Sequence, residues 1–284
     1  MSSLVEHQEV LFELLTEFDR ICRAHNIKYT LFAGTALGAI RHKGFIPWDD
    51  DVDVAMLRED YNKFLQIAPE EIDSQKYYIQ AEYSEHWNMH FSKLRKNNTT
   101  CLEKYHPNDN LIHQGIYIDI FPCDNASDNS LFRKVQFLAS RIVLAKNMSA
   151  RGYETDSLLK KIFIVVCKML PLKLSQNIAE LKKHQDTKLV HTFFGGTSTY
   201  QKGIYPREWF EELMNTPFNG SNLLISKYYD ELLKTMYGDY MKIPSEDERK
   251  CKVHAILVDV DKSYTEYSDY RKGMEFDIYT RSIR

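Results

Sequence analysis

The sequence lacks the features that mark secreted, disulfide-bonded or membrane-spanning proteins. Its five cysteines are odd in number and include no C-x-x-C pair, which argues against a disulfide framework and a zinc site. The most apolar stretch, residues 158–174, is too short and too often interrupted by lysine to cross a bilayer. The first residues, MSSLVEHQEVLFELL, carry acidic side chains where a signal peptide would be basic and then apolar. We therefore expect a cytoplasmic protein.

An excess of positive charge is also missing. The net charge is −3 and the isoelectric point is near 6.4, whereas a protein that binds nucleic acid would be distinctly basic. We therefore expect no nucleic-acid partner. The 284 residues contain no internal repeat or low-complexity tract, and 43% of them are hydrophobic, which is ordinary for a globular chain.

The most informative stretch is GTALGAIRHKGFIPWDDDVD at residues 34–53. It ends in an acidic run whose adjacent carboxylates repel one another, and burial would raise that cost. Such a run is tolerated when the charges are solvated or when a cation neutralises them. Alternation in Asp51-Val52-Asp53-Val54 favours the cation, because an extended strand would place both acids on one face. Asp51 and Asp53 are therefore our first candidates for holding one or two divalent ions.

A phosphate site is predicted just before this run. Gly34 and Thr35 follow an apolar segment and are expected to begin a helix, whose free N–H groups and positive dipole end favour an anion. A turn glycine and a simple cap would give the same pattern. Arg41, His42 and Lys43 then supply a phosphate clamp, or a solvated basic loop.

Three further residues are candidates on weaker grounds. Trp48 stacks on a base or covers the core, and the two interpretations are equally supported by the sequence. Asp50 is expected to orient the acidic loop or a metal-bound water. His254 is the one late histidine with a candidate binding role, although a structural histidine gives the same signal.

A third acid comes from a later strand. Asp119 interrupts the apolar run at residues 115–122, and a lone carboxylate there is costly unless it is paired or bound to metal. An edge position facing solvent, or a salt bridge to arginine, is the less favoured alternative. Asp259 and Asp261 repeat the D-x-D pattern near the C-terminus without the glycine turn or basic triplet, so we interpret them as a surface strand end.

The spacing of apolar residues, and the glycines and prolines that end helices and strands, predict a chain of mixed helices and strands. We expect helices at residues 4–25, 34–41, 58–68 (ended by Pro69), 158–174, 176–191 and 221–236, and strands at 77–81, 90–96, 99–104, 115–122 and 253–260.

The string GTALGAIRHKGFIPWDDDVDVAMLREDYNKF closely resembles the signature of the LicD family, bacterial phosphotransferases of the nucleotidyltransferase superfamily that attach phosphocholine to cell-surface glycans. GIYIDIFPCD and YYDELLKTMYGDYMKIP followed by His254 resemble later parts of the same family. The resemblance implies an α+β fold with a nucleotidyltransferase-like mixed β-sheet, flanking helices and a helical insertion. It also implies one catalytic domain over 1–284, with a core at about 20–125, a helical segment at about 126–195 and a C-terminal return at 196–284.

The resemblance further implies how the acids are used. Asp51, Asp53 and Asp119 would be the catalytic and metal-binding residues, with Mg²⁺ as the cofactor and Mn²⁺ as its alternative. The donor would be CDP-choline or a similar CDP-alcohol. The acceptor would be a sugar hydroxyl on a lipid-linked teichoic-acid or lipopolysaccharide precursor.

Several alternatives stay open. A nucleotidyltransferase that uses an NTP needs the same acids, and a non-enzymatic module would use them to bind metal or glycan. The alcohol could also be ethanolamine, ribitol or glycerol. Residues 158–174 either make a peripheral membrane contact, at the inner face of the plasma membrane, or form a buried helix of the insertion.

Overall fold

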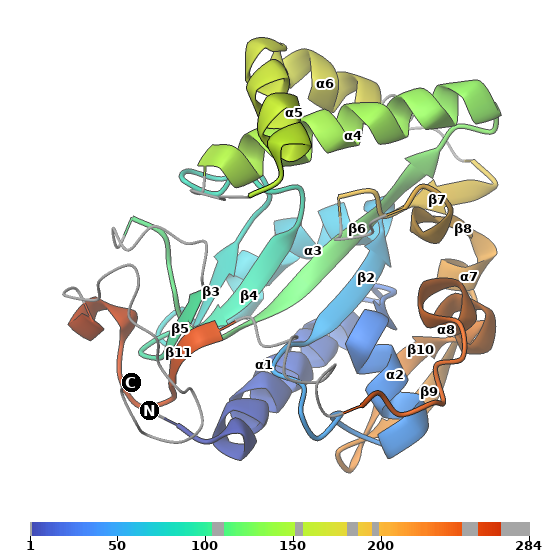
Figure 1. Cartoon of the computed structure of the whole chain (residues 1–284). Coiled ribbons are helices and arrows are strands. Elements are labelled where there is room, and N and C mark those ends of the chain that lie inside the picture. The colour runs from blue at the N-terminus through green and yellow to red at the C-terminus, as the bar shows by residue number, and fades with distance from the viewer. Residues whose placement is uncertain are drawn as a thin grey trace.

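The computed structural model describes residues 2–103, 111–150, 156–180, 187–194, 199–245 and 255–267. Its centre is a mixed seven-stranded sheet with the order β1-β2-β6-β4-β3, to which β7 and β8 are added beside the end of β6 (Figure 1). Strands β2 and β6 are parallel, and the other pairs are antiparallel. The expected α+β class is confirmed. The strands are β1 (Thr30–Leu31), β2 (Asp53–Leu57), β3 (Tyr77–Gln80), β4 (Ser92–Lys96), β6 (Tyr117–Ala126), β7 (Leu189–His191) and β8 (Ile204–Pro206).

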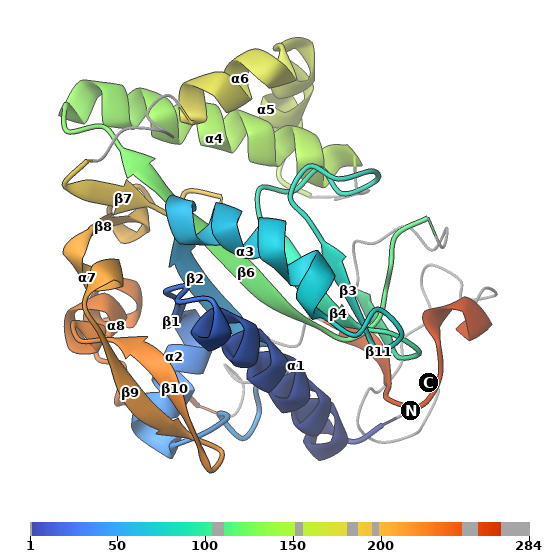
Figure 2. The same cartoon turned by 180° about the vertical axis from the view of Figure 1, so that it is seen from behind.

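Helices α1 (Leu4–Ala24) and α3 (Arg58–Glu71) cover one face of the sheet (Figure 2). Helix α1 forms as predicted, because Ser3 and Glu6 make a capping box and its apolar residues recur on one face. That face is buried over β4 and β6 through Leu11, Leu14, Leu15, Phe18 and Ile21. Helix α2 (Ala33–His42) lies beside β2 and β9 and also contacts α8.

The remaining elements surround this core. Helices α4 (Ser130–Ala150), α5 (Leu158–Met169) and α6 (Leu172–Ala179) lie together where β6 ends (Figures 1 and 2). Helices α7 (Glu208–Glu211) and α8 (Tyr229–Tyr237) lie near the hairpin of β9 (Leu213–Phe218) and β10 (Ser221–Ser226). Strands β5 (Thr100–Glu103) and β11 (Ala255–Asp259) form a separate pair. Among the described residues, every helix is too short or too polar to cross a bilayer.

Four of the predicted elements are wrong in part. The helix predicted at 158–174 is interrupted at Pro171, so it forms α5 and the start of α6. Pro69 does not end α3, which continues to Glu71. The proline removes one N–H donor, but helical bonding resumes after it, with the Ile72 N–H donating to the carbonyl of Ala68 at 3.0 Å. The helix predicted at 176–191 stops at Ala179, and Leu189–His191 pairs with β6 instead. The helix predicted at 221–236 is strand β10 followed by α8. Asn219 and Gly220 both have positive φ and close the two-residue turn before β10, which an Asn-Gly pair favours.

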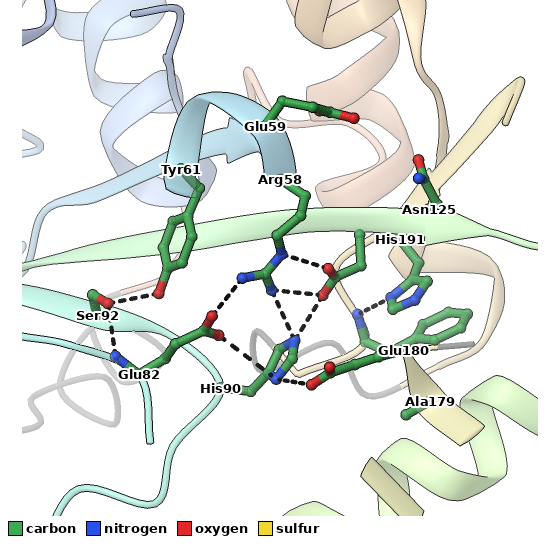
Figure 3. A network of polar contacts seen from close by, with 12 residues as sticks. Arg58, Glu59, Tyr61, Glu82, His90, Ser92, Asn125, Ala179, Glu180 and His191 are labelled. Atoms are coloured by element: carbon green, nitrogen blue, oxygen red, sulfur yellow. Dashed lines mark hydrogen bonds and ion pairs between the residues drawn. The ribbon is translucent and has the colours of Figure 1, made fainter. Parts of the chain in front are cut away.

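A buried polar network connects α3 to β4, β6 and the end of α6 (Figure 3). Arg58 donates from Nε and Nη2 to the two oxygens of Asp124 at 2.7 and 3.0 Å, and from Nη1 to Glu82 Oε1 at 2.6 Å. His90 Nε2 lies 2.7 Å from Asp124 Oδ2, and His90 Nδ1 lies 3.2 Å from Glu180 Oε1. These contacts connect Arg58 of α3 with Asp124 of β6 and, through His90, with Glu180 at the end of α6.

Candidate active site

Helix α2 begins at the edge of the predicted site, at Ala33. Phe32 precedes it without a side-chain cap, and its N–H donates to the carbonyl of Asp53 at 3.0 Å. Ala33 has a φ of +45°, a left-handed conformation that costs a non-glycine residue free energy. The first N–H groups of the helix have no intrahelical acceptor, so this end can bind an anion. The predicted helix start is confirmed, one residue earlier than expected.

Gly34 allows the acidic loop to approach this helix start. A Cβ atom at Gly34 would lie 2.8 Å from Asp49 Oδ2 and 3.9 Å from Asp51 Oδ1. Negative charge is favourable at the positive end of a helix, so the contact also lessens the repulsion between the acids. Helix α1 holds the loop from the other side, because Gln8 Nε2 donates to the carbonyls of Ile46 and Asp49 at 3.2 and 2.9 Å.

Thr35 connects the helix to the first acid of β2. The Thr35 hydroxyl oxygen accepts a hydrogen bond from the Asp53 N–H at 2.8 Å, and the side chain is buried. This bond positions Asp53 and uses an acceptor site of the hydroxyl. Its proton can still be donated, so the predicted contact to a phosphate stays a prediction.

The acids converge from one loop and two strands. One carboxylate oxygen from each of Asp49, Asp50 and Asp51 lies within 4.8 Å of the other two. Asp53 and Asp119 are register partners on the parallel strands β2 and β6, which places their side chains on the same face of the sheet. Strand β2 begins only at Asp53, and Asp51 lies in the loop before it. The expected alternation is still present, because Val52 and Val54 are buried whereas Asp51 and Asp53 are only partly buried.

The cluster is electrostatically costly without a cation. Burial raises the pKa of Asp53 well above its ordinary value, and the negative charges of Asp51, Asp119 and Asp49 raise it further. The predicted acids Asp51 and Asp119 are therefore each near enough to act on Asp53. Asp49 belongs to the same cluster and was not among the predicted residues, although it is the first acid of the same run.

A buried lysine balances part of this charge. Lys93 on β4 is the register partner of Asp119, and its Nζ lies 3.0 Å from Asp119 Oδ1 and 3.6 Å from Glu103 Oε1. The ring centroid of Tyr117 is 3.1 Å from the same nitrogen, and Lys93 is only 2% exposed. Burial raises the pKa of Asp119, while the Lys93 ammonium acts in the opposite direction. Sequence reasoning missed Lys93, because SKLRK reads as a strand with a solvated basic face.

The predicted basic triplet lies at the other end of α2. Arg41 is about 9 Å along the helix axis from Thr35, and its Nη1 donates to the carbonyl of Tyr240 at 2.8 Å. Lys43 ends the helix with a φ of +60°, and its carbonyl accepts from the Asn219 N–H at 3.0 Å. The structure therefore does not bring these residues to the helix start.

The other predicted binding residues have different positions. Trp48 packs against the core and meets the ring of His42 edge-on, with centroids 6.0 Å apart. Burial and the charge of Arg41 lower the pKa of His42. Asp50 is 8% exposed. His254 lies outside the described residues.

Tyr237, the last residue of α8, is a further functional candidate. Burial raises the pKa of its hydroxyl, and so do the negative charges of Asp53, Asp51 and Asp49. The side chain as a whole is 41% exposed, so it lies at the border between the acid cluster and solvent. Nothing in the local sequence indicated this contact, which depends on the packing of α8 against α2.

Comparison with known proteins agrees with this arrangement. The family model described as LicD/FKTN/FKRP, nucleotidyltransferase domain, matches residues 26–148, which include every described acid of the site. The lipopolysaccharide cholinephosphotransferase LicD of Haemophilus influenzae is 30% identical over 266 residues, covering 87% of this chain and 95% of the relative. The chain belongs to the LicD family. Two shorter matches, to uncharacterized proteins of Rickettsia typhi and Rickettsia prowazekii, are 43% and 42% identical over 60 residues and cover 21% of this chain and 19% and 23% of those proteins.

Proposed function

We propose that this LicD-family protein is a metal-dependent phosphotransferase. It moves phosphocholine from CDP-choline to a sugar hydroxyl of a lipid-linked cell-surface glycan precursor, such as a teichoic-acid or lipopolysaccharide intermediate. The observation that carries the proposal is the meeting of Asp53 and Asp119 on neighbouring strands, beside the acidic loop and the start of α2. The name of the Haemophilus influenzae relative supports phosphocholine as the transferred group.

The acids fit a divalent ion such as Mg²⁺, with Mn²⁺ as the alternative. All the candidate ligands are carboxylates, which hard cations prefer, and burial together with the charges of Asp51, Asp119 and Asp49 raises the pKa of Asp53. Asp51, Asp53 and Asp119 would hold the ion, and Asp49 is added to this set by its position. When bound, the ion would neutralise charge on the donor pyrophosphate during transfer.

The chain's own groups would bind the donor and accept the proton. The start of α2 at Gly34 and Thr35 would bind a donor phosphate through N–H groups and the Thr35 hydroxyl. The acceptor oxygen would form a bond to the phosphorus that carries choline, the bond from that phosphorus to the CMP oxygen would break, and CMP would leave. Asp119, held in place by Lys93, would take the acceptor proton.

The decisive experiment separates the donor classes. The purified chain is incubated with Mg²⁺ and either a CDP-alcohol (choline, ethanolamine, ribitol or glycerol) or an NTP, with a sugar acceptor. Release of CMP from CDP-choline supports the proposal. Release of pyrophosphate from an NTP would instead identify a nucleotidyltransferase, and metal or glycan binding without turnover would identify a binding module.

A pair of variants connects the activity to the site. Asp51→Asn removes one carboxylate of the cluster and is expected to abolish turnover while the chain stays folded. Asp261→Asn makes the same chemical change at an exposed position in the second D-x-D pattern and should leave turnover unchanged. Full activity of Asp51→Asn would contradict the assignment of the metal site.

A further inference from the structure

Helices α4, α5 and α6, here called the helical platform, present an unusually apolar surface. Within α5 only Cys167 is buried, whereas Leu159 is 80% and Met169 is 82% exposed. Soluble proteins seldom leave so many large apolar side chains in contact with water without a binding partner. The exposed apolar residues of the platform and its connections are Leu131, Phe132, Val135, Leu138, Leu158, Leu159, Ile162, Phe163, Val165, Val166, Met169, Leu170 and Leu174.

The exposed apolar side chains of α5 form one continuous stripe. At 100° per residue they fill an arc of about 160° around the helix, with Lys161 and Lys168 along one border and Lys160 beyond the other. The helix is held firmly in this orientation. Lys146 of α4 donates from Nζ to the carbonyls of Cys167, Lys168 and Leu170 at 3.2, 3.0 and 2.6 Å.

The platform is also strongly basic. Its three helices contain eight lysines and arginines and no aspartate or glutamate, although the whole chain has a net charge of −3. The exposed members of this set are Lys134, Lys160, Lys161, Lys168 and Lys173. A ligand for this surface must therefore accept apolar side chains and carry negative charge beside them.

We propose that the helical platform lies on the surface of an anionic lipid bilayer. The apolar stripe of α5 would enter the boundary between headgroups and acyl chains, and the flanking lysines would contact lipid phosphates. A second copy of the chain fits less well, because a twofold interface would bring the same basic helices against each other. Helix α5 has 12 residues, too few to cross a bilayer.

The position of the platform relative to the acids has a consequence that rests on the proposed function. Strand β6 connects the two, because Asp119 lies near its start and the platform follows its last residue, Ala126. Seven residues of strand span roughly 23 Å. The acids would therefore lie at some distance from the lipid headgroups, and an acceptor sugar attached to a membrane lipid would have to extend across that distance.

Co-sedimentation of the full chain with vesicles tests the proposal without any donor or acceptor. One set of vesicles contains equal parts of phosphatidylglycerol and phosphatidylcholine, and the other contains phosphatidylcholine alone. We expect binding to the anionic vesicles, weak binding to the neutral ones, and release in 0.5 M salt. The double variant Leu159→Asp with Val166→Asp should weaken the apparent binding constant about tenfold or more.

Val5→Asp serves as the matched control, because Val5 is 64% exposed on α1, outside the platform. It should bind vesicles like the unaltered chain, and circular dichroism checks that all variants fold. Release of CMP from CDP-choline should be the same in the platform variants, so a failed vesicle experiment and a failed transferase assay are distinguishable. The proposal is overturned if anionic vesicles do not bind the chain. It is also overturned if the double variant binds them equally, or if that variant instead dissociates a dimer measured by light scattering.

Discussion

Asp53 and Asp119 occupy the same register position on two adjacent parallel strands. Because β2 and β6 run in the same direction, their side chains leave the sheet on one face, next to the loop that carries Asp51. Burial and three neighbouring carboxylates raise the pKa of Asp53. These acids thus lower the stability of the folded chain, and a cation bound among them would offset that cost.

This cost gives the first prediction. A carboxyl group whose pKa is raised in the folded chain favours folding below its ordinary pKa near 3.8, and that contribution is lost as the pH rises through the folded-state value. In EDTA at pH 8 we expect Asp53→Asn to raise the free energy of unfolding by on the order of 1 kcal/mol, measured with urea. The same variant should lose at least about a hundredfold in kcat/KM.

Two comparisons make that prediction specific. Mg²⁺ should raise the melting temperature of the unaltered chain more at pH 8 than at pH 5, and it should raise that of Asp53→Asn less. The control Asp261→Asn, at an exposed position, should change neither the stability in EDTA nor the rise in melting temperature caused by Mg²⁺. If Asp53→Asn destabilised the chain in EDTA at pH 8, the repulsion inferred among these acids would be refuted.

The second prediction concerns the close contact between Gly34 and Asp49. Gly34→Ala would place a methyl group 2.8 Å from Asp49 Oδ2, so the carboxylate must move away from the helix start. We expect kcat/KM to fall about tenfold or more, because small displacements of a catalytic site are costly. The stability should change little, since the end of an aspartate side chain can shift.

Gly38→Ala is the matched control on the same helix. Its methyl group would lie 2.5 Å from the carbonyl oxygen of Gly44. This oxygen is part of the backbone, so it cannot move away without distorting the chain. This variant should therefore lower the melting temperature. A Gly34→Ala protein with unaltered kinetics would show that the contact with Asp49 does not matter for activity.

Sequence reasoning succeeded where the signal was local. The acidic run and the helix that begins beside Gly34 are both contiguous in the chain, and Asp119 was found because one charge interrupts an apolar strand. The pairing of Asp119 with Asp53 depends on β2 and β6 being neighbours in the sheet. The family resemblance implied that these acids act together, whereas the composition of the chain did not.

The failures come from tertiary contacts. Lys93 looks like a solvated strand residue, yet the β4–β6 register places it opposite Asp119. Tyr237 reaches the site only through the packing of α8 against α2. The hairpin turn at Asn219 and Gly220 has a local signal, the Asn-Gly pair, but the apolar spacing after it also fits a helix.

The third prediction tests the pair formed by Lys93 and Asp119. Lys93→Met removes the ammonium that pairs with the partly buried carboxylates of Asp119 and Glu103. We expect it to lower the free energy of unfolding by about 3 kcal/mol in EDTA. Asp119→Asn should cost less in the Lys93→Met background than in the unaltered chain, with a coupling energy of about 1–3 kcal/mol in a double-mutant cycle.

The alternative role of Lys93 is packing on the ring of Tyr117, whose centroid is 3.1 Å from Nζ. Packing alone would make the effects of the two substitutions additive. A coupling energy near zero would therefore assign Lys93 to the aromatic contact and remove it from the description of the acid site.

The last prediction concerns the buried network around Arg58 (Figure 3). Burial lowers the pKa of His90, but the charge and hydrogen bond of Asp124 and the hydrogen bond to Glu180 outweigh it, so the pKa lies above its ordinary value near 6.5. A histidine with a raised pKa makes its full contribution to stability at pH values below its ordinary pKa. That contribution is lost as the pH rises through the folded-state pKa. Burial alone would raise the pKa of Asp124. The charges and hydrogen bonds of Arg58 and His90 outweigh burial and hold this pKa well below its usual range.

We therefore expect the free energy of unfolding to decline above about pH 6.5, by on the order of 1 kcal/mol, through His90 alone. His90→Gln should be less stable at pH 6 and should show a flatter profile between pH 6 and 9 in urea unfolding. His86→Gln, which alters a histidine whose side chain is 45% exposed, is the control and should keep the slope of the unaltered chain. Equal slopes for His90→Gln and the unaltered chain would mean that His90 is neutral in the network, and that Arg58 alone balances the carboxylates of Asp124 and Glu82.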